Sequence, residues 1–353
     1  MNEHAVYDVT IIGGGPAGLY SAFYSGLRGM TTKLIESQPH LGGKVNVYPE
    51  KIIWDVGGLP PLTGDQLIQN LMEQARIFDP EIVLNEKVTS IAKNEEGLFL
   101  LHTLSGTIHY SRTVILAIGG GILRPQKLAV EGADRFESAN LHYSVKSMTR
   151  FKGKTVLISG GGNSAVDWAN ELSGIARSVY LIYRKETLKG HEASVAKLEQ
   201  SGVISLTNTE IVGLIPTADG RAIGKVVLQN NEDGSRAELA VDEVIVNHGY
   251  DRDTDLIANS QVKIEMKNEY CIAVRPNGET SVPGLFAAGD IIAHEGKVYL
   301  IAGAFTDAAN AVNRAKQYII PNAEGYGMVS SHNERFDERN RDFKKRLFSV
   351  EMS

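Results

Sequence analysis

The sequence predicts an α/β fold with two Rossmann-like, three-layer dinucleotide-binding domains, one inserted within the other. One pattern occurs twice, in residues 9–23 and 154–172: a short apolar run, a glycine cluster and then a helical pattern. A strand far along the chain then ends in Gly289-Asp290, where it can complete the first domain. At 353 residues, the chain is also longer than one hydrophobic core comfortably supports.

The first glycine cluster follows a predicted buried strand at residues 9–12. Gly13, Gly15 and Gly18 fit the pattern G-x-G-x-x-G. Its first glycine allows a sharp turn, the second lets the backbone approach a pyrophosphate, and the third lets the helix pack on the strand. Glu36 closes the next strand, where a carboxylate can accept a hydrogen bond from a ribose. A structural turn without a ligand is the alternative, but the flanking strand and helix favour a dinucleotide bound at the helix N-terminus.

The rest of the first domain alternates helix and strand signals. Thr63 can cap a helix that ends near residue 78, with three apolar residues on one face (Leu67, Leu71 and Ala75). Three further runs are typical of a β-meander: residues 86–92, 98–103 and 107–110. A separate buried strand at residues 114–118 ends at three glycines, where we place the crossing to the second domain.

The second glycine cluster follows a strand at residues 154–159 and has the form G-x-G-x-x-A. The residues expected to contact its dinucleotide are Gly160, Gly162, Asn163, Ser164 and Ala165. Two such units in one chain imply two nucleotide ligands that face each other.

The second unit carries basic residues where the first carries Glu36. Arg184, Lys185 and Lys189 follow its second strand. An acid there would bind a free ribose hydroxyl, whereas a basic cluster can neutralise a 2′-phosphate. The guanidinium can do so as a bidentate fork. We therefore predict NADPH at this site; a solvated basic surface is the alternative.

Residues 204–246 are predicted to be mostly strands, and 247–251 mark the return to the first domain. Asp290 is placed to accept a hydrogen bond from a sugar hydroxyl of the first ligand; a helix cap is the alternative role. A helix is predicted over residues 299–318. Its apolar side is expected to hold Ala302, Phe305, Ala309, Val312 and Ala315.

Composition excludes several other classes of protein. A net charge of −6 gives no support for nucleic-acid binding. The single cysteine, Cys271, cannot form a disulfide within the chain and fits a reducing compartment. The sequence shows no signal-peptide pattern, no apolar run long enough for a membrane span, and no metal-ligand cluster. We expect a soluble cytoplasmic protein.

The C-terminal segment has an amphipathic pattern. Phe336, Phe343 and Leu347 recur at helical spacing, which predicts a tail helix. That helix could dock on the protein through this side. Alternatively, its basic residues could form a face for an acidic partner (Arg339, Arg341, Lys344, Lys345 and Arg346).

Together these motifs resemble the flavoproteins with two dinucleotide folds, within them the low-molecular-weight thioredoxin reductases. The resemblance implies an FAD domain at residues 1–118 and 249–330, an NADPH domain at 119–248 and a tail at 331–353. Thioredoxin reductases carry a C-x-x-C pair before the second glycine unit, but residues 140–146 contain no cysteine. Glutathione-reductase-type enzymes carry a pair after Gly42-Gly43, where this chain has Lys44 and no cysteine. The chain therefore resembles the ferredoxin–NADP(+) reductases of the thioredoxin-reductase-like type.

That resemblance implies the roles of further residues. Tyr48 would stack on one face of the flavin, and His332 from the tail of a partner subunit would approach the other face. The FAD contacts implied by motif and resemblance together are Gly13, Gly15, Pro16, Ala17, Gly18, Glu36, Lys44, Tyr48, Val88, Leu123, Asp290 and Ser331. The implied enzyme is a homodimer that transfers electrons between NADPH and a ferredoxin or flavodoxin. A reductase of quinones, dyes or a separate disulfide protein remains an alternative, as does a redox sensor without turnover.

Overall fold

The computed structural model describes residues 5–121, 124–251, 253 and 255–350. The contacts divide the chain into two compact units, and the second interrupts the first. Unit 1 comprises Met1–Asn46, Lys51–Ile122 and Arg252–Ser353, and unit 2 comprises Val47–Glu50 and Leu123–Asp251. This division puts the four residues around Tyr48 in unit 2, apart from their neighbours in sequence.

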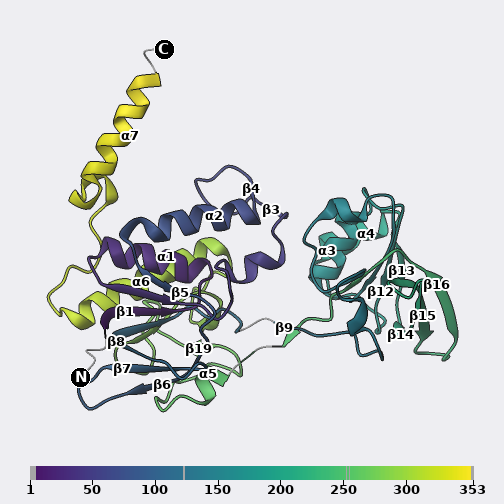
Figure 1. The fold of residues 1–353 in the computed structure, drawn as a ribbon, viewed down its shortest axis with the longest axis horizontal. Helices are drawn as coiled ribbons and strands as arrows, with labels where there is room; N and C mark the ends of the chain where they lie inside the picture. The colour runs from purple at the N-terminus through teal and green to yellow at the C-terminus, as the bar shows by residue number, and fades with distance from the viewer. Residues whose placement is uncertain (1–4, 122–123, 252, 254, 351–353) are drawn as a thin grey trace. The chain divides into compact units, whose positions relative to one another are not determined.

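Unit 1 contains the elements around the first glycine loop and the C-terminal elements (Figure 1). Its helices are α1 Pro16–Leu27, α2 Gly64–Ala75, α5 Asp255–Ala258, α6 Ile301–Ile319 and α7 Asp337–Val350. Its strands are β1 Val6–Ile12, β2 Thr32–Ile35, β3 Ile52–Ile53, β4 Leu62–Thr63, β5 Glu81–Val83, β6 Val88–Lys93, β7 Phe99–Thr103, β8 Ile108–Leu116, β19 Ile272–Ala273, β20 Leu285–Ala287 and β21 Ile292–Ala293.

The main sheet of unit 1 runs in the order β5-β2-β1-β8-β7-β6, and β20 also pairs with β8. Strands β5, β2, β1, β8 and β20 are parallel, whereas β7 and β6 continue antiparallel from β8. Helices α1, α2 and α6 lie on one side of the parallel part (Figure 1). Because parallel strands place their carboxyl ends at one edge, the ends of β1, β2 and β20 converge there.

The third run of the predicted meander and the predicted buried strand are one continuous strand, β8. The prediction of two strands was wrong here because Ser111 and Thr113 separate the apolar residues, yet both are fully buried. Their hydroxyl groups are satisfied by the carbonyl oxygens of Thr113 and Asp8, respectively. A buried polar residue with a partner does not end a strand.

Two predicted helices differ in how well their buried face was predicted. In α2, Thr63 caps the helix through a capping box with Gln66, and Leu67, Leu71 and Ala75 are buried as predicted. In α6, the buried residues are Ala304, Asp307, Ala308, Ala311, Val312 and Ala315. The prediction for α6 was wrong for Ala302, Phe305 and Ala309, which are only partly buried. The buried face is thus shifted around the helix from the predicted one: it keeps Val312 and Ala315 and includes a charged residue, Asp307.

Unit 2 contains helices α3 Asn163–Leu172 and α4 Glu192–Glu199. Its strands are β9 Arg124–Pro125, β10 Leu141–His142, β11 Thr155–Ser159, β12 Ser178–Ile182, β13 Ile204–Leu206, β14 Thr209–Pro216, β15 Ile223–Asn230, β16 Arg236–Ala240, β17 Glu243–Val246 and β18 Tyr250–Asp251. A parallel sheet runs in the order β10-β17-β11-β12-β13, and β14, β15 and β16 form an antiparallel meander. Helices α3 and α4 lie together on the side of the parallel sheet that is opposite the meander (Figure 1).

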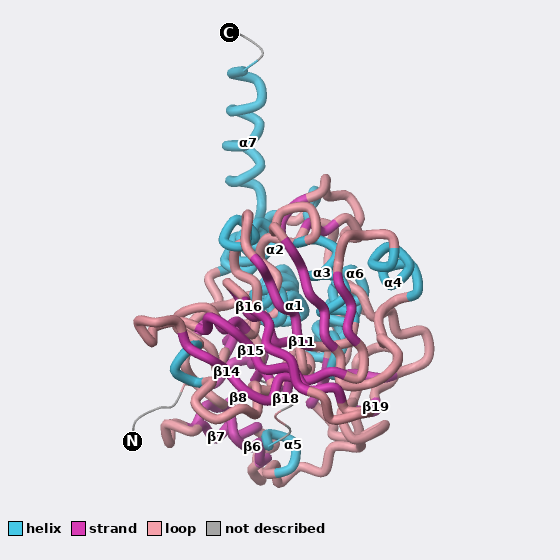
Figure 2. The backbone as a smooth tube through the Cα atoms, turned by 90° about the vertical axis from the view of Figure 1, so that its right-hand side faces the viewer, coloured by secondary structure: helices cyan, strands magenta, loops and turns pink. Residues whose placement is uncertain are grey.

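The C-terminal helix α7 extends away from the rest of unit 1 (Figure 2). Phe336, just before it, contacts Phe78 with ring centroids 5.4 Å apart, and Arg339 donates a hydrogen bond to the carbonyl of Ile77. Beyond that first turn, Phe343 is 64% exposed and Leu347 is 53% exposed. Within the described part of a single chain, Phe336 is therefore packed, whereas Phe343 and Leu347, the other two residues of the predicted apolar side, are left uncovered.

Candidate dinucleotide-binding sites

The first glycine loop closes a turn that only glycine can make. Gly13 has a φ of +106°, and a Cβ atom there would lie 2.4 Å from the carbonyl oxygen of Ala117. A Cβ on Gly18 would lie 1.8 Å from the carbonyl oxygen of Gly13. Both glycines therefore allow the close packing of α1 on the ends of β1 and β8 that the sequence pattern predicts.

Gly15 has a different environment from the other two glycines. It is the N-cap residue of α1, and Pro16 begins the helix. A Cβ on Gly15 would meet only the Cα atom of Gly43, at 3.7 Å. The space in front of the helix N-terminus is thus open to a pyrophosphate, and the uncapped N–H groups of the first turn can donate to it.

Glu36 follows the end of β2 and holds the first loop in place. It is 8% exposed, and its Oε2 atom accepts a hydrogen bond of 2.7 Å from the backbone N–H of Gly14. Its Oε1 atom accepts from the N–H of Gln38 and from the hydroxyl of Ser37. Each carboxylate oxygen can accept more than one hydrogen bond, so these contacts leave acceptor capacity for a ribose hydroxyl.

The other residues predicted to contact FAD lie in several places. Lys44 is exposed on the short 3-10 helix Gly43–Val47, and Asp290 is exposed on the turn after β20. Ala17 is buried in the first turn of α1. Val88 begins β6, and its side chain belongs to the core of unit 1, so only its backbone is left for a ligand. Leu123 lies outside the described residues.

The second glycine loop has the same division of roles. Gly160 has a φ of +150°, and a Cβ there would lie 2.4 Å from the carbonyl oxygen of Asn247. A Cβ on Gly161 would lie 2.3 Å from the ring of Tyr183. Gly162, the N-cap residue of α3, has no atom within 4 Å of its would-be Cβ. As in the first loop, the glycine at the helix N-terminus is the one left open.

The predicted basic edge lies beside this open position. Arg184, Lys185 and Lys189 are all exposed. The N–H of Lys189 donates to the carbonyl of Gly161 at 2.6 Å, which fixes the basic segment against the glycine loop. The side chain of Asn163, at the start of α3, accepts from the N–H of His191. The open loop and the three cations therefore form one surface suited to a phosphorylated dinucleotide.

His248 belongs to this surface but was not predicted as a site residue. It follows the end of β17, and its Nε2 atom lies 2.8 Å from the hydroxyl of Ser159 at the end of β11. Burial and the nearby guanidinium of Arg184 lower the pKa of His248. No local sequence pattern marks His248. It reaches Ser159 because β17 pairs with β11, although a separate meander lies between the two strands along the chain.

The sequence matches the family described as "Pyridine nucleotide-disulphide oxidoreductase" over residues 7–315. It is 61% identical to ferredoxin–NADP reductase 1 of Bacillus cytotoxicus, over 98% of this chain and 99% of that protein. It is 60% identical to ferredoxin–NADP reductase 1 of Bacillus licheniformis, over 99% of this chain and 100% of that protein. The chain belongs to the pyridine nucleotide-disulphide oxidoreductase family and, within it, to the ferredoxin–NADP reductases.

Solved structures confirm the predicted fold class. The thioredoxin reductase of Lactococcus lactis matches with a TM-score of 0.72 at 24% identity, covering 89% of this chain and 99% of that one. The thioredoxin reductase of T. acidophilum matches with a TM-score of 0.73 over the same shares at 24% identity. As a member of the ferredoxin–NADP reductase family, the chain is an oxidoreductase with FAD and NADP(H) as its cofactors.

Tyr48 and His332 are the residues with predicted flavin-stacking roles, and Ser331 is predicted to lie near the flavin. Tyr48 is half-buried in Val47–Glu50, which unit 2 holds through the Glu50 carboxylate accepting from the N–H of Met148 at 2.6 Å. Ser331 and His332 are exposed on the 3-10 helix Ser330–His332. For this ferredoxin–NADP reductase, the roles of these three residues stay predictions.

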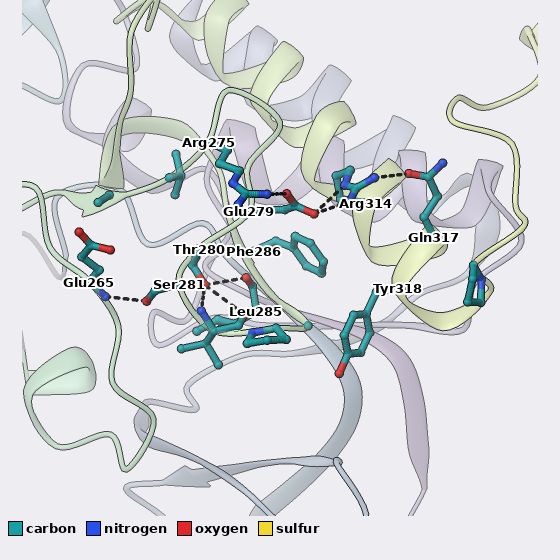
Figure 3. Close-up of a pocket in the computed structure, with 16 residues that line it drawn as sticks. Glu265, Arg275, Glu279, Thr280, Ser281, Leu285, Phe286, Arg314, Gln317 and Tyr318 are labelled. Atoms are coloured by element: carbon teal, nitrogen blue, oxygen red, sulfur yellow. Dashed lines mark hydrogen bonds and ion pairs between the residues drawn. The ribbon is translucent and has the colours of Figure 1, made fainter.

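A pocket of about 730 Å³ lies elsewhere in unit 1 (Figure 3). Its lining comes from the residues before β20 and from the last turns of α6, including Glu279, Arg314 and Tyr318. Glu279 and Arg314 pair across it at 2.5 Å. Among the residues that the structure describes, no predicted cofactor residue lines this pocket.

In the described residues, no helix is both long and apolar enough to span a membrane.

Proposed function

We propose that this protein transfers electrons between NADPH and a ferredoxin through bound FAD. The observation that carries the proposal is the contrast between the two strand ends. Glu36 is a buried acid bonded to the first loop, whereas Arg184 and Lys185 are exposed bases beside the second. An acid suits the free ribose of FAD and a basic pair suits the 2′-phosphate of NADPH. The names of the relatives support ferredoxin as the acceptor.

The residues present fit both cofactors. The open glycines, Gly15 and Gly162, leave room for a pyrophosphate at a helix N-terminus in each unit. Bound FAD would supply the redox chemistry, by accepting a hydride from NADPH and releasing electrons to a one-electron acceptor. The protein's part is to bind each dinucleotide at its own loop, to select NADPH by its 2′-phosphate, and to orient the two rings.

No dithiol carries the electrons onward. Cys271 is the only cysteine in the sequence, so a redox disulfide within the chain is excluded. Electrons must therefore leave the flavin directly to an external acceptor. We extend the acceptor class to flavodoxin, which also accepts single electrons, and we place the enzyme in the cytoplasm, where a lone cysteine stays reduced.

We also propose a homodimer in which each tail contacts the flavin of the other copy. The tail is attached to the C-terminal end of α1, where Arg335 donates to the carbonyl of Gly26. The first glycine loop lies at the other end of this 12-residue helix, about 18 Å away. This anchor lies at the end of α1 that is farther from the glycine loop of its own chain. We therefore assign His332 and Ser331, which precede Arg335 by three and four residues, to a second copy.

The exposed apolar residues of α7 support the same arrangement. Phe343 and Leu347 lie four residues apart, on one side of the helix. If they pack on a second copy, Phe343→Ser/Leu347→Ser will lower the mass measured by light scattering from dimer to monomer. Arg341→Ser/Lys345→Ser on the same helix is the control and will remain dimeric. A wild-type protein that is monomeric at micromolar concentration would overturn the dimer proposal.

An acceptor screen under anaerobic conditions tests the proposed function. The FAD-loaded protein is supplied with NADPH and, in separate reactions, with a ferredoxin, a flavodoxin, a quinone, a dye and an oxidised dithiol protein. We expect turnover with ferredoxin or flavodoxin, and we expect it to weaken as salt rises because charge steers the encounter. Turnover with the quinone and the dye alone, and background rates with both protein acceptors at every ionic strength, would refute the proposal.

A further inference from the structure

Unit 1 buries an ion pair that the proposed mechanism does not use. Asp307 on α6 is 7% exposed, and the side chain of Lys297 is 2% exposed. The Nζ atom of Lys297 lies 2.5 Å from Oδ2 of Asp307. Removing two charges from water costs several kcal/mol per ion, so a buried pair does not by itself stabilise a fold. The contacts that this pair makes indicate another role.

The same carboxylate oxygen holds the backbone of the turn after β20. The N–H of Gly289 donates to Oδ2 of Asp307 at 3.3 Å. Gly289 has a φ of +84°, and a Cβ there would lie 3.0 Å from the Cβ of Ala17 in the first turn of α1. The next residue is Asp290, a predicted FAD contact. Asp307 therefore fixes the turn at the point where it meets the first glycine loop.

Lys297 is held in place by the segment that leads into α6. Its ammonium donates to the carbonyl of Val298 at 3.3 Å as well as to Asp307. A Cβ on Gly303 would lie 2.2 Å from that carbonyl oxygen, so a glycine is needed for the segment to pack on the helix. On the other side, Nε2 of His294 is buried 3.7 Å from Oδ1 of Asp307. Asp307 is thus enclosed on both oxygens and has little freedom to move.

We propose that Asp307 and Lys297 are positioning residues for FAD. Asp307 accepts from the Gly289 N–H and so keeps the Gly289–Asp290 turn packed against the first glycine loop, and Lys297 neutralises the carboxylate in this buried place. The inference rests on the FAD site assigned to unit 1. It does not depend on the electron acceptor, so a failure of the ferredoxin proposal leaves it unaffected.

Two double variants of the full-length protein test the inference. Lys297→Met/Asp307→Asn removes both charges but keeps an oxygen that can accept from Gly289. Lys297→Met/Asp307→Leu removes both charges and the acceptor at nearly the same side-chain volume. The FAD dissociation constant of each is measured by titrating FAD into the apo-protein and following flavin fluorescence. The visible spectrum of bound FAD and the melting temperature of the apo-protein are recorded for both.

We expect the Asn variant to bind FAD within about threefold of wild type and the Leu variant about tenfold more weakly, because an unpaired buried N–H is costly. The bound-flavin spectrum should shift in the Leu variant alone. Equal FAD affinities in the two double variants would overturn the proposal. So would a Leu variant whose lower affinity is matched by a lower apo-protein melting temperature and an unchanged flavin spectrum, since that result indicates a structural role only.

Discussion

In the first glycine loop a Cβ on the third glycine, Gly18, would lie 1.8 Å from the carbonyl oxygen of Gly13, whereas the second loop already carries Ala165 at the matching position. The two loops also end differently, since Glu36 is buried against its loop and Arg184 is exposed beside its own. The backbone plan is shared: a positive-φ glycine at the strand end and an open glycine at the helix N-terminus. The shared plan binds a pyrophosphate, and the differing side chains select which dinucleotide supplies it.

The largest expected effect comes from exchanging the packing residues of the two loops. Gly18→Ala forces α1 away from the strand end, so we expect FAD binding to fall at least about 100-fold and the apo-protein to lose stability. Ala165→Gly removes a methyl group from a helix already spaced for it and should cost about 1 kcal/mol with little change in NADPH affinity. FAD titration and thermal unfolding measure both. Similar effects of the two variants would show that the loops are packed alike.

The second prediction inverts the charge at the second strand end. Arg184→Glu should lower kcat/KM for NADPH by about 100-fold, because a carboxylate repels the 2′-phosphate that the guanidinium binds. The value for NADH should change less than about threefold, since NADH has no phosphate at that position. Arg236→Glu, on the exposed strand β16, is the matched control and should alter neither substrate. Equal losses for NADPH and NADH would contradict a 2′-phosphate contact at Arg184.

The open glycines separate ligand binding from folding. Gly162→Ala adds a methyl group with no protein atom within 4 Å, and Gly15→Ala adds one that meets only the Gly43 Cα at 3.7 Å. Apo-protein stability should stay within about 0.5 kcal/mol of wild type in both. We expect Gly162→Ala to raise the KM for NADPH about tenfold without changing FAD affinity. We expect Gly15→Ala to weaken FAD binding about tenfold without changing the KM for NADPH. In each variant the added methyl group meets the pyrophosphate. A loss of both ligands in either variant would mean that the loops do not act separately.

The sequence was sufficient to predict what is local. Strand, glycine turn and helix follow one another within a few residues in each loop, so their spacing predicts the elements. The helix cap at Thr63 and the basic residues after β12 are local in the same sense. Contacts between residues distant in sequence could not be predicted. The Lys297–Asp307–Gly289 contacts require α6 to turn a charged residue inward, and apolar periodicity does not predict such a residue on the buried side.

Two further features were missed for a related reason: Val47–Glu50 groups with unit 2, and His248 pairs with Ser159. In both cases the partner lies about 90 or more residues away. Only the finished topology brings such residues together. The positions of Glu36 and Arg184 were predictable because both follow the ends of predicted strands, whereas the contacts that support them were not. Their selection of the cofactors stays a prediction.

A smaller effect is expected at Glu243, which begins β17 at the end of the unit 2 sheet opposite the glycine loop. Glu243 is 2% exposed, and its carboxylate is bound by His142 at 2.6 Å and by Lys154 at 2.5 Å. Burial by itself would raise the pKa of Glu243, but these hydrogen bonds and the nearby cations bring it below the ordinary value. Glu243→Gln should lower the free energy of unfolding by about 2 kcal/mol at pH 7. Glu238→Gln, in an exposed pair with Lys225, should change it by less than about 0.5 kcal/mol.

The pH dependence of that difference has a defined sign. The folded-state pKa of Glu243 lies below its unfolded value of about 4.5, so its stabilisation is fully present above that pH. It is lost as the pH falls through the folded-state pKa. Chemical denaturation from pH 7 to pH 3 should therefore show wild type and Glu243→Gln converging below about pH 4.5. A constant difference across this range would mean that the charge of Glu243 does not contribute.

The central claim is that two different dinucleotide sites pass electrons outward without a thiol. Its most direct test compares wild type with Cys271→Ser in NADPH-driven ferredoxin reduction under anaerobic conditions, with flavin bleaching by NADPH followed in the same samples. We predict the same rate of flavin reduction and the same ferredoxin turnover, within about twofold, because no step uses the thiol. If Cys271→Ser still bleaches with NADPH at the wild-type rate but no longer reduces ferredoxin, the claim is contradicted.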